Sequence, residues 1–393
     1  MKKISLARPF IKTNIVLEEI RKVLDSRWIS GGPTIAKFEE AIRDYNNDPN
    51  GFYVAVANGT VALELALMLI NNGERLTPFD DEVIVPSYSW VASGFAVENV
   101  GGTPVWCDVN YFGVPSVETI KPLITRKTMA IIIVHQMGIP CDLDAINYLA
   151  DEFDLQIIED GAPAIGSEYK GNRLGKTQNI FTYSFQARKV LTTGEGGMIA
   201  VRTKTKAEWL KSMRAFGTNV SPLERDKADK LLKESFNEFG TNYKISDITA
   251  AVGLAHLKYI DEEIDMRTRA GEYYNELVYG MAMDGFDIRP ANMIPDYCTR
   301  YNWANYHVVF GDSIDRDDVV DKLRKRGIGC KWDIQAIHKE PVYGNYYDEK
   351  ELPVTMAFHN HGFWLPFYAE ITKEDQDYVI ATLKEVLLKN MKE

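Results

Sequence analysis

The sequence is poor in cysteine, and it contains no run of basic residues and no long apolar stretch. Its cysteines lie far apart without a CxxC pair, which argues against a disulfide framework and against a zinc site. They are Cys107, Cys141, Cys298 and Cys330. We expect them to be buried, reduced thiols of a cytoplasmic protein, and we expect no bound metal.

Two further absences limit the partners of the chain. The longest apolar runs, such as Ala130–Val134, have the length of a strand and cannot span a bilayer. Near the N-terminus, Arg8 and Lys12 come too early for the apolar core of a signal peptide. The 56 acidic residues outnumber the 45 basic ones, so the formal net charge is −11. That balance argues against nucleic acid and against an anionic membrane surface as the main partner.

The composition that remains is that of an ordinary globular protein, with 45% hydrophobic and 26% charged residues. Apolar, β-branched runs alternate with helical segments, and this pattern predicts an α/β fold with a buried, mostly parallel sheet. The predicted strands are Phe52–Val56, Glu82–Pro86, Pro104–Val109, Met129–His135, Leu155–Ile158, Ile180–Phe185 and Met198–Val201. The predicted helices are Ile15–Ser26, Thr34–Tyr45, Val61–Asn71, Ser89–Val97 and Asp142–Glu152.

The pattern changes in the second part of the chain. One long helix is predicted from Ser246 to about Met281, and it is expected to link two domains. A compact α+β segment follows, with strands at Val308–Phe310 and Gly329–Trp332 and helices at Asp317–Arg326 and Lys373–Lys389. We therefore expect a large α/β domain over residues 1–250, and a linker helix with a smaller α+β domain over residues 251–393.

In an open α/β sheet the ligand lies beyond the carboxyl ends of the strands, so the residues after each strand are the candidates for function. Asn58-Gly59-Thr60 begins a helix after the first strand, and the exposed N–H groups there suit a phosphate. Trp90 follows the second strand and offers an aromatic face. Asp160 ends a later strand, and Ser184 lies near the end of the strand that precedes Lys189.

A phosphate cup, an aromatic ring, a carboxylate and an amine are together what pyridoxal phosphate requires. The amine forms a Schiff base with the cofactor aldehyde, and the carboxylate keeps the pyridine nitrogen protonated. Each of these features alone is common; a glycine-threonine turn before a helix, for example, is usually only a cap. Their joint order along one alternating α/β chain indicates a cofactor site.

The motifs around these residues resemble those of the DegT/DnrJ/EryC1/StrS family of pyridoxal phosphate-dependent sugar aminotransferases. The resemblance runs from about Ile4 to the final helix and implies the fold type I architecture of aspartate aminotransferase. The motifs that carry it are Ala57-Asn58-Gly59-Thr60-Val61-Ala62-Leu63, Asp81-Glu82-Val83-Ile84-Val85-Pro86, Ile158-Glu159-Asp160-Gly161-Ala162, Ser184-Phe185-Gln186-Ala187-Arg188-Lys189, Leu191-Thr192-Thr193-Gly194-Glu195-Gly196-Gly197-Met198 and Asn242-Tyr243-Lys244-Ile245-Ser246-Asp247.

The resemblance implies a role for each of these positions. It implies that Lys189 bonds the cofactor, that Asp160 faces the pyridine nitrogen and that Trp90 stacks on the ring. The expected phosphate-binding residues are Asn58, Gly59, Thr60 and Ser184. It also implies that Asn242 reaches the phosphate from a neighbouring subunit, and hence that the protein is a homodimer with shared active sites.

Two residues match positions near the sugar pocket of the family, and three positions depart from the family pattern, namely Pro163, Lys244 and Gln186 itself. The resemblance implies that Gln186 and His338 contact the substrate, although a satisfied structural role for His338 is an equal alternative. Three residues after Asp160, the family usually has Gln, His or Glu near the phenolic oxygen of the cofactor. Pro163 stands there instead and has no donor to offer.

The resemblance implies a two-step amino transfer. L-Glutamate gives its amino group to the cofactor, with pyridoxamine phosphate as the intermediate, and a nucleotide-linked deoxy-ketosugar then takes it to become an aminosugar. Such sugars occur in lipopolysaccharide O-antigen. The alternatives are transamination of a keto-cyclitol, dehydration of a ketosugar by related enzymes that carry His in place of the lysine, and a non-catalytic binding protein. Lys189 favours transamination over dehydration, and together with Asp160 and the phosphate motif it argues against a binding protein.

One histidine pair raises the question of a metal. His359-Asn360-His361 places two imidazoles close together, but no third ligand is evident nearby in the sequence. We therefore expect histidines of a loop that precedes the Gly362–Pro366 segment.

Overall fold

The computed structural model describes residues 2–344 and 351–390 of the chain. Its main feature is a seven-stranded sheet with the strand order β1-β9-β8-β5-β4-β2-β3. The strands of this sheet are β1 (Phe52–Val56), β2 (Glu82–Pro86), β3 (Thr103–Cys107), β4 (Thr128–Val134), β5 (Gln156–Asp160), β8 (Ile180–Ser184) and β9 (Gly197–Val201). Each predicted strand is present, with ends that differ by no more than a few residues.

The five strands β3, β2, β4, β5 and β8 pair in parallel, whereas β9 pairs antiparallel with both β8 and β1. The prediction of a mostly parallel α/β sheet is therefore confirmed. In the register of β4 and β5, Val134 lies opposite Asp160. The carboxyl ends of the parallel strands consequently meet at one edge, where a ligand site is expected.

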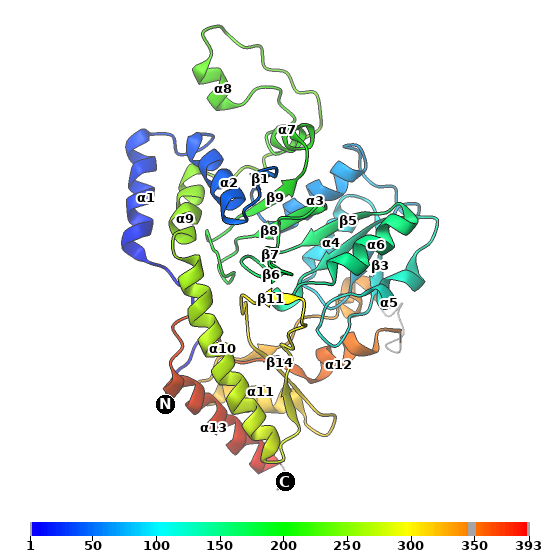
Figure 1. Cartoon of the computed structure of the whole chain (residues 1–393), viewed down its shortest axis with the longest axis vertical. Helices are drawn as coiled ribbons and strands as arrows, with labels where there is room; N and C mark the ends of the chain where they lie inside the picture. The colour runs from blue at the N-terminus through cyan, green and yellow to red at the C-terminus, as the bar shows by residue number, and fades with distance from the viewer. Residues whose placement is uncertain (1, 345–350, 391–393) are drawn as a thin grey trace.

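Helices cover both faces of this sheet (Figure 1). The helices in the first part of the chain, before Asp247, are α1 (Thr13–Ser26), α2 (Pro33–Tyr45), α3 (Gly59–Ile70), α4 (Ala92–Asn99), α5 (Val117–Ile120), α6 (Leu143–Phe153), α7 (Lys204–Met213) and α8 (Pro222–Lys227), with 3-10 turns η1 (Lys121–Leu123) and η2 (Gln136–Gly138). Alternate residues of β4 enter different cores. Ile131 and Ile133 pack in the cluster that contains Phe38 of α2, and Ile132 packs in the cluster that contains Leu65 of α3.

A second, antiparallel sheet has the strand order β10-β12-β14-β13. A small third sheet pairs β11 with β6 and β6 with β7. The elements of this region are β6 (Glu168–Tyr169), β7 (Asn172–Arg173), β10 (Ile288–Pro290), β11 (Cys298–Arg300), β12 (His307–Phe310), α11 (Arg316–Lys325), β13 (Lys331–Trp332), η3 (Ile337–Lys339), η4 (Pro341–Tyr343), α12 (Pro353–His361), β14 (Gly362–Trp364) and α13 (Lys373–Asn390). In Figure 1 the four-stranded sheet, α11 and α13 lie below the central sheet, and α8 sits on an arm that projects above α7.

The single long helix predicted from Ser246 is wrong, because the structure has two helices, α9 (Asp247–Leu257) and α10 (Ile260–Met283). The break lies at Tyr259, whose backbone angles (φ −133°, ψ 16°) are not helical. The Tyr259 hydroxyl accepts a hydrogen bond from the Lys12 backbone N–H at 3.2 Å, and its ring lies edge-on to Phe10. These tertiary contacts outweigh the apolar periodicity that continues through the break.

The expected histidine loop is also wrong, because His359 and His361 belong to the last turn of α12. In the described residues, no group of three or more His, Cys, Asp or Glu side chains is arranged to hold a metal ion. The four cysteines are free, and three are buried, but Cys298 is only half-buried in β11. Among the described helices, none is long and apolar enough to span a membrane.

The start of the chain lies beside its C-terminal part. Ile4 forms a bridge with Ile328, and the Phe367 N–H donates to the Leu6 carbonyl at 2.9 Å. The N-terminal strand-like segment therefore packs with the small sheet, although it precedes the large one in sequence. The division into domains at about residue 250 stays a prediction.

Candidate active site

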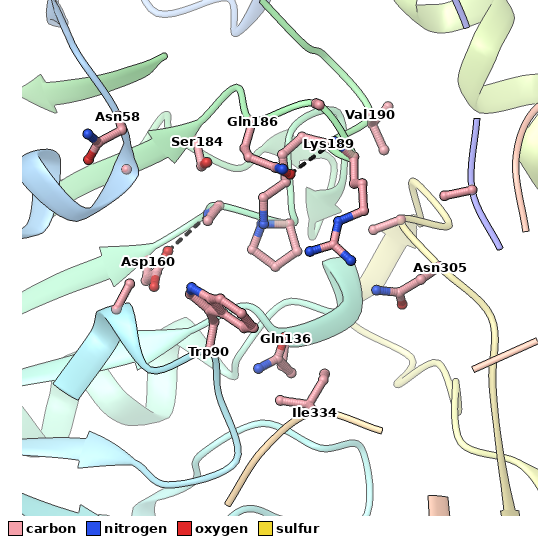
Figure 2. A pocket seen from close by; sticks show the side chains of 18 of the residues that line it. Asn58, Trp90, Gln136, Asp160, Ser184, Gln186, Lys189, Val190, Asn305 and Ile334 are labelled. Atoms are coloured by element: carbon pink, nitrogen blue, oxygen red, sulfur yellow. Dashed lines mark hydrogen bonds between the residues drawn. The ribbon is translucent and has the colours of Figure 1, made fainter. Parts of the chain in front are cut away.

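A cavity of about 630 Å³ opens beyond the carboxyl ends of the parallel strands. Its walls come from the central sheet, from the N-terminal segment Leu6–Pro9 and from the small sheet at Lys331 and Trp364. Eight of the predicted site residues line it: Asn58, Gly59, Thr60, Trp90, Asp160, Ser184, Gln186 and Lys189. Figure 2 shows the labelled members of this set gathered around one space. The fold thus brings together residues that lie up to 131 positions apart, from Asn58 to Lys189.

Lys189 lies in the turn that follows β8. Its backbone N–H donates to the Gln186 carbonyl at 2.8 Å, and this bond closes the turn. Burial lowers the pKa of the Lys189 amine; the charge of Asp160 opposes this effect, and the Arg188 guanidinium adds to it. A lysine with a lowered pKa is more often neutral at physiological pH, which is what a nucleophile or general base requires.

Asp160 is the last residue of β5, and only 5% of its surface is exposed. Its Oδ1 accepts the Ala162 N–H and its Oδ2 accepts the Ser93 hydroxyl, both at 3.0 Å. Burial raises the pKa of the Asp160 carboxyl, whereas the Ala162 N–H, the charge of Lys189 and the Ser93 hydroxyl act in the opposite direction. The side chain is therefore an oriented, buried carboxyl group that faces the cavity.

The N-terminus of α3 forms another wall. Asn58 caps the helix, with its Oδ1 accepting the Val61 N–H at 3.0 Å. A Cβ atom on Gly59 would lie only 2.9 Å from the Cβ of Ser184, so this position requires glycine for close packing. The first turn of α3 and the Ser184 side chain therefore form one concave surface, with the positive end of the helix dipole toward the cavity.

Trp90 belongs to the turn just before α4, although the sequence predicted it within a helix that begins at Ser89. Its carbonyl accepts the Ser93 N–H at 3.1 Å, which fixes the turn. The side chain is 54% exposed, an unusual state for a tryptophan, and it lines the cavity. This half-exposed indole offers an aromatic face beside Asp160, as Figure 2 shows.

Two predicted site residues do not line the cavity. His338 is 1% exposed, and its Nδ1 and the Ser87 hydroxyl lie 2.6 Å apart, while its backbone N–H donates to the same Ser87 oxygen. These bonds hold His338 in the wall behind the cavity rather than at its surface. Asn242 lies on the outer surface of the chain, where its backbone bridges to Ala215. Its predicted role needs a second subunit and stays a prediction.

Other cavity residues were not predicted from the sequence. Ser93 lies one turn after Trp90, and Gln136 follows the end of β4, so the rule of strand ends could have found both. Arg8 and Lys331 also line the cavity, but they come from the N-terminal segment and from the small sheet. No local pattern marks these two, because only the packing of distant segments brings them to the site.

Pro163 lines the cavity close to Asp160 in sequence, as expected. Its carbonyl accepts the Asn302 side-chain N–H at 2.8 Å, and the same amide group also bonds the Ile165 carbonyl. Pro163 thus lines the cavity, while its carbonyl oxygen is hydrogen-bonded to Asn302.

Comparison with known proteins shows the family to which the chain belongs. The model of the DegT/DnrJ/EryC1/StrS aminotransferase family matches residues 11–384. GDP-perosamine synthase from Caulobacter vibrioides is 33% identical over 391 residues, which cover 98% of this chain and 99% of that protein.

Solved structures agree with the same fold. The aminotransferase TlmJ from Streptoalloteichus hindustanus is 25% identical, with a TM-score of 0.87 over 99% of this chain and 100% of that one. The sugar aminotransferase Spr1654 from Streptococcus pneumoniae, in its pyridoxal phosphate form, is 25% identical, with a TM-score of 0.86 over 99% of both chains. The match over nearly the whole chain confirms the predicted fold, cofactor and enzyme class: the chain belongs to the DegT/DnrJ/EryC1/StrS aminotransferase family and is a pyridoxal phosphate-dependent sugar aminotransferase.

Proposed function

We propose that the enzyme transfers the amino group of L-glutamate to the keto group of a nucleotide-linked deoxy-ketosugar. The observation that carries the proposal is the meeting of Lys189, Asp160, Trp90 and the N-terminus of α3 in one cavity of an aminotransferase fold. The similarity to GDP-perosamine synthase, whose name includes a nucleotide, supports a substrate of this class.

The residues present fit pyridoxal phosphate. We assign Asp160 to the pyridine nitrogen, because it is a buried carboxyl group with both oxygens already oriented by donors. We assign the phosphate to the concave surface of Gly59, Thr60 and Ser184, with Asn58 as the cap that holds it. The bound cofactor supplies an aldehyde that exchanges amines and a ring that accepts electrons.

Lys189 has two tasks in this proposal. Its amine holds the cofactor before the donor arrives, and it then moves a proton from the donor Cα atom to the cofactor carbon that carries the amine. Burial lowers the pKa of Lys189 and so increases the neutral fraction that can take this proton. Asp160 supports the transfer by keeping the pyridine nitrogen protonated, and Trp90 holds the ring plane in place.

The charges around the cavity favour an anionic substrate. Arg8, Arg188 and Lys331 line it, in a chain whose net charge is −11. The ammonium of Lys331 lies 4.0 Å from the centre of the Trp364 ring, which keeps this cation at the cavity wall. A cluster of cations in an acidic protein suits the carboxylates of glutamate and the diphosphate of a nucleotide sugar. We assign Gln186, which also lines the cavity, to the sugar.

The proposal includes a homodimer in the cytoplasm. Asn242 is exposed and does not line the cavity of its own chain, although its neighbour Tyr243 does, so its side chain is accessible to a second subunit. The four free cysteines are compatible with a reducing compartment.

A screen for amine formation tests the proposal. The purified protein is incubated with L-glutamate and a panel of nucleotide-linked 3- and 4-ketosugars and keto-cyclitols, and 2-oxoglutarate and the aminated product are measured. We expect equal amounts of both products with at least one sugar, and none with the Lys189→Ala variant. Product formation only from keto-cyclitols, or undiminished turnover in Lys189→Ala, would contradict the proposed function.

A further inference from the structure

Ser93 and Ser89 form a buried pair of hydroxyl groups next to Asp160. The Ser93 Oγ lies 3.0 Å from Asp160 Oδ2, and the Ser89 Oγ lies 2.9 Å from the Ser93 Oγ. Ser93 is 1% exposed and Ser89 2% exposed, so bulk water does not replace these bonds. Neither serine has a part in the assignments above.

The direction of these hydrogen bonds follows from the groups themselves. The Ser93 hydroxyl donates its single hydrogen to Asp160 Oδ2, so the Ser93 oxygen is left to accept from Ser89. Ser89 must then donate its own hydrogen to the Ser93 oxygen. The pair is a one-way relay, Ser89 to Ser93 to Asp160, in which each bond polarises the next.

The relay acts on one oxygen of Asp160, and a backbone group acts on the other. The Ala162 N–H occupies Oδ1 at 3.0 Å, and Ser93 occupies Oδ2 at 3.0 Å. The two donors fix the plane of the carboxyl group and stabilise its negative charge. This matters because burial opposes that charge and raises the pKa of Asp160.

We propose that the Ser89–Ser93 relay keeps Asp160 ionised and aimed at the pyridine nitrogen of the cofactor. Ser93 acts through Asp160 and is therefore a positioning residue rather than a catalytic one. The position of the pair strengthens the inference, since Ser93 lies one turn after Trp90. One short segment therefore supplies both the aromatic face of Trp90 and the hydroxyl group that bonds Asp160. The inference rests on the assignment of Asp160 in the proposed function.

The test compares two ligands that differ at the ring atom to which Asp160 is assigned, the pyridine nitrogen. Dissociation constants are measured, from the quenching of tryptophan fluorescence, for pyridoxal phosphate and for its 1-deaza analogue, which carries C–H in place of the pyridine nitrogen. The variants are Ser93→Ala, Ser89→Ala and Ser93→Thr, which keeps the hydroxyl. Thr182→Val is the matched control, because Thr182 is a buried hydroxyl that bonds the Glu159 carbonyl and not the Asp160 carboxyl.

We expect Ser93→Ala to weaken pyridoxal phosphate binding about tenfold, the effect of one hydrogen bond to a charged group. Ser89→Ala should weaken pyridoxal phosphate binding less. Ser93→Thr and Thr182→Val should bind pyridoxal phosphate with nearly the same dissociation constant as the original protein. None of the variants should change binding of the deaza analogue more than about twofold. Equal weakening of both ligands by Ser93→Ala, or no weakening of either, would overturn the inference.

The outcomes separate this inference from the proposed function. If the unmodified protein binds pyridoxal phosphate no better than the deaza analogue, the assignment of Asp160 itself fails. If it binds pyridoxal phosphate better but Ser93→Ala leaves that preference intact, only the relay fails. Thermal unfolding of the cofactor-free variants shows whether each one is folded at the temperature of the measurement.

Discussion

Asp160 lines the cavity as a buried carboxyl group, and its surroundings have opposing effects on its negative charge. Burial disfavours its charge, and the donors from Ala162 and Ser93 favour it. A buried, ionised carboxylate without a cationic partner reduces the stability of the cofactor-free chain. The same carboxylate would pair strongly with the pyridinium ion of the bound cofactor.

The first prediction concerns Asp160→Asn in the cofactor-free protein. The pKa of Asp160 is raised in the folded chain, so its ionisation destabilises the fold above that pKa, and this effect disappears as the pH falls below the ordinary value near 3.8. Asp160→Asn should therefore raise the melting temperature at pH 7, and the gain should shrink toward pH 4. Calorimetry at both pH values measures this, and a gain that does not depend on pH would contradict it.

The second prediction concerns the same substitution in the presence of cofactor. Asp160→Asn removes the charge opposite the pyridinium, so pyridoxal phosphate should bind more than about a hundredfold more weakly. Equilibrium dialysis measures the dissociation constant. Affinity within a few-fold of the original protein would show that another group serves the pyridine nitrogen.

Sequence reasoning named eight residues that line the cavity, but it did not name Arg8 or Lys331, which also line it. Asp160 ends a strand, and Lys189 and Trp90 follow strands, so the rule of strand ends and the resemblance to a family single them out together. Arg8 and Lys331 could not be predicted, because their place depends on how the N-terminal segment packs with the small sheet.

At the scale of elements, a buried network joins α9 and α10 across the break between them. His256 of α9 and Arg267 of α10 both bond the Glu263 carboxylate, at 2.8 Å each. The Thr192 N–H bonds the other ring nitrogen of His256 at 3.2 Å, so the network continues into the segment that follows Lys189. The sequence pattern could not predict this break, because the contacts of Tyr259 with Phe10 and Lys12 form only in the folded chain.

The third prediction compares two neighbouring glutamates. Glu263→Ala leaves His256 and Arg267 buried without their shared acceptor, and it should lower the free energy of unfolding by about 3–5 kcal/mol. Glu262→Ala is the control, because Glu262 pairs with Lys12 at the surface and should lose at most about 1 kcal/mol. Urea unfolding of both variants measures the difference. Similar losses for both would show that the network contributes little to stability.

At the scale of the whole molecule, the proposed shared site links the function of one chain to a second copy. Lys189 lines the cavity of its own chain, whereas Asn242 is on the outer surface. The general fold follows from the alternating sequence pattern, but no pattern within one chain could show that a residue serves another chain.

The fourth prediction tests this arrangement by mixing subunits. Lys189→Ala and Asn242→Ala should each be far less active than the original enzyme when assembled alone. In a hybrid dimer, one site contains both substitutions and the other contains neither. An equal mixture of re-assembled subunits should therefore recover about a quarter of the original activity. No recovery would show that Asn242 acts within its own chain, and full activity of Asn242→Ala would show that it has no role.

The most direct test of the account asks which residue bonds the cofactor. The protein is incubated with pyridoxal phosphate, reduced with borohydride and digested, and the modified peptide is identified by mass spectrometry. We expect a stable cofactor adduct on Lys189, and no adduct when L-glutamate is added before reduction, because the donor releases the lysine. An adduct on a different lysine, or an adduct on Lys189 that glutamate does not prevent, would contradict it.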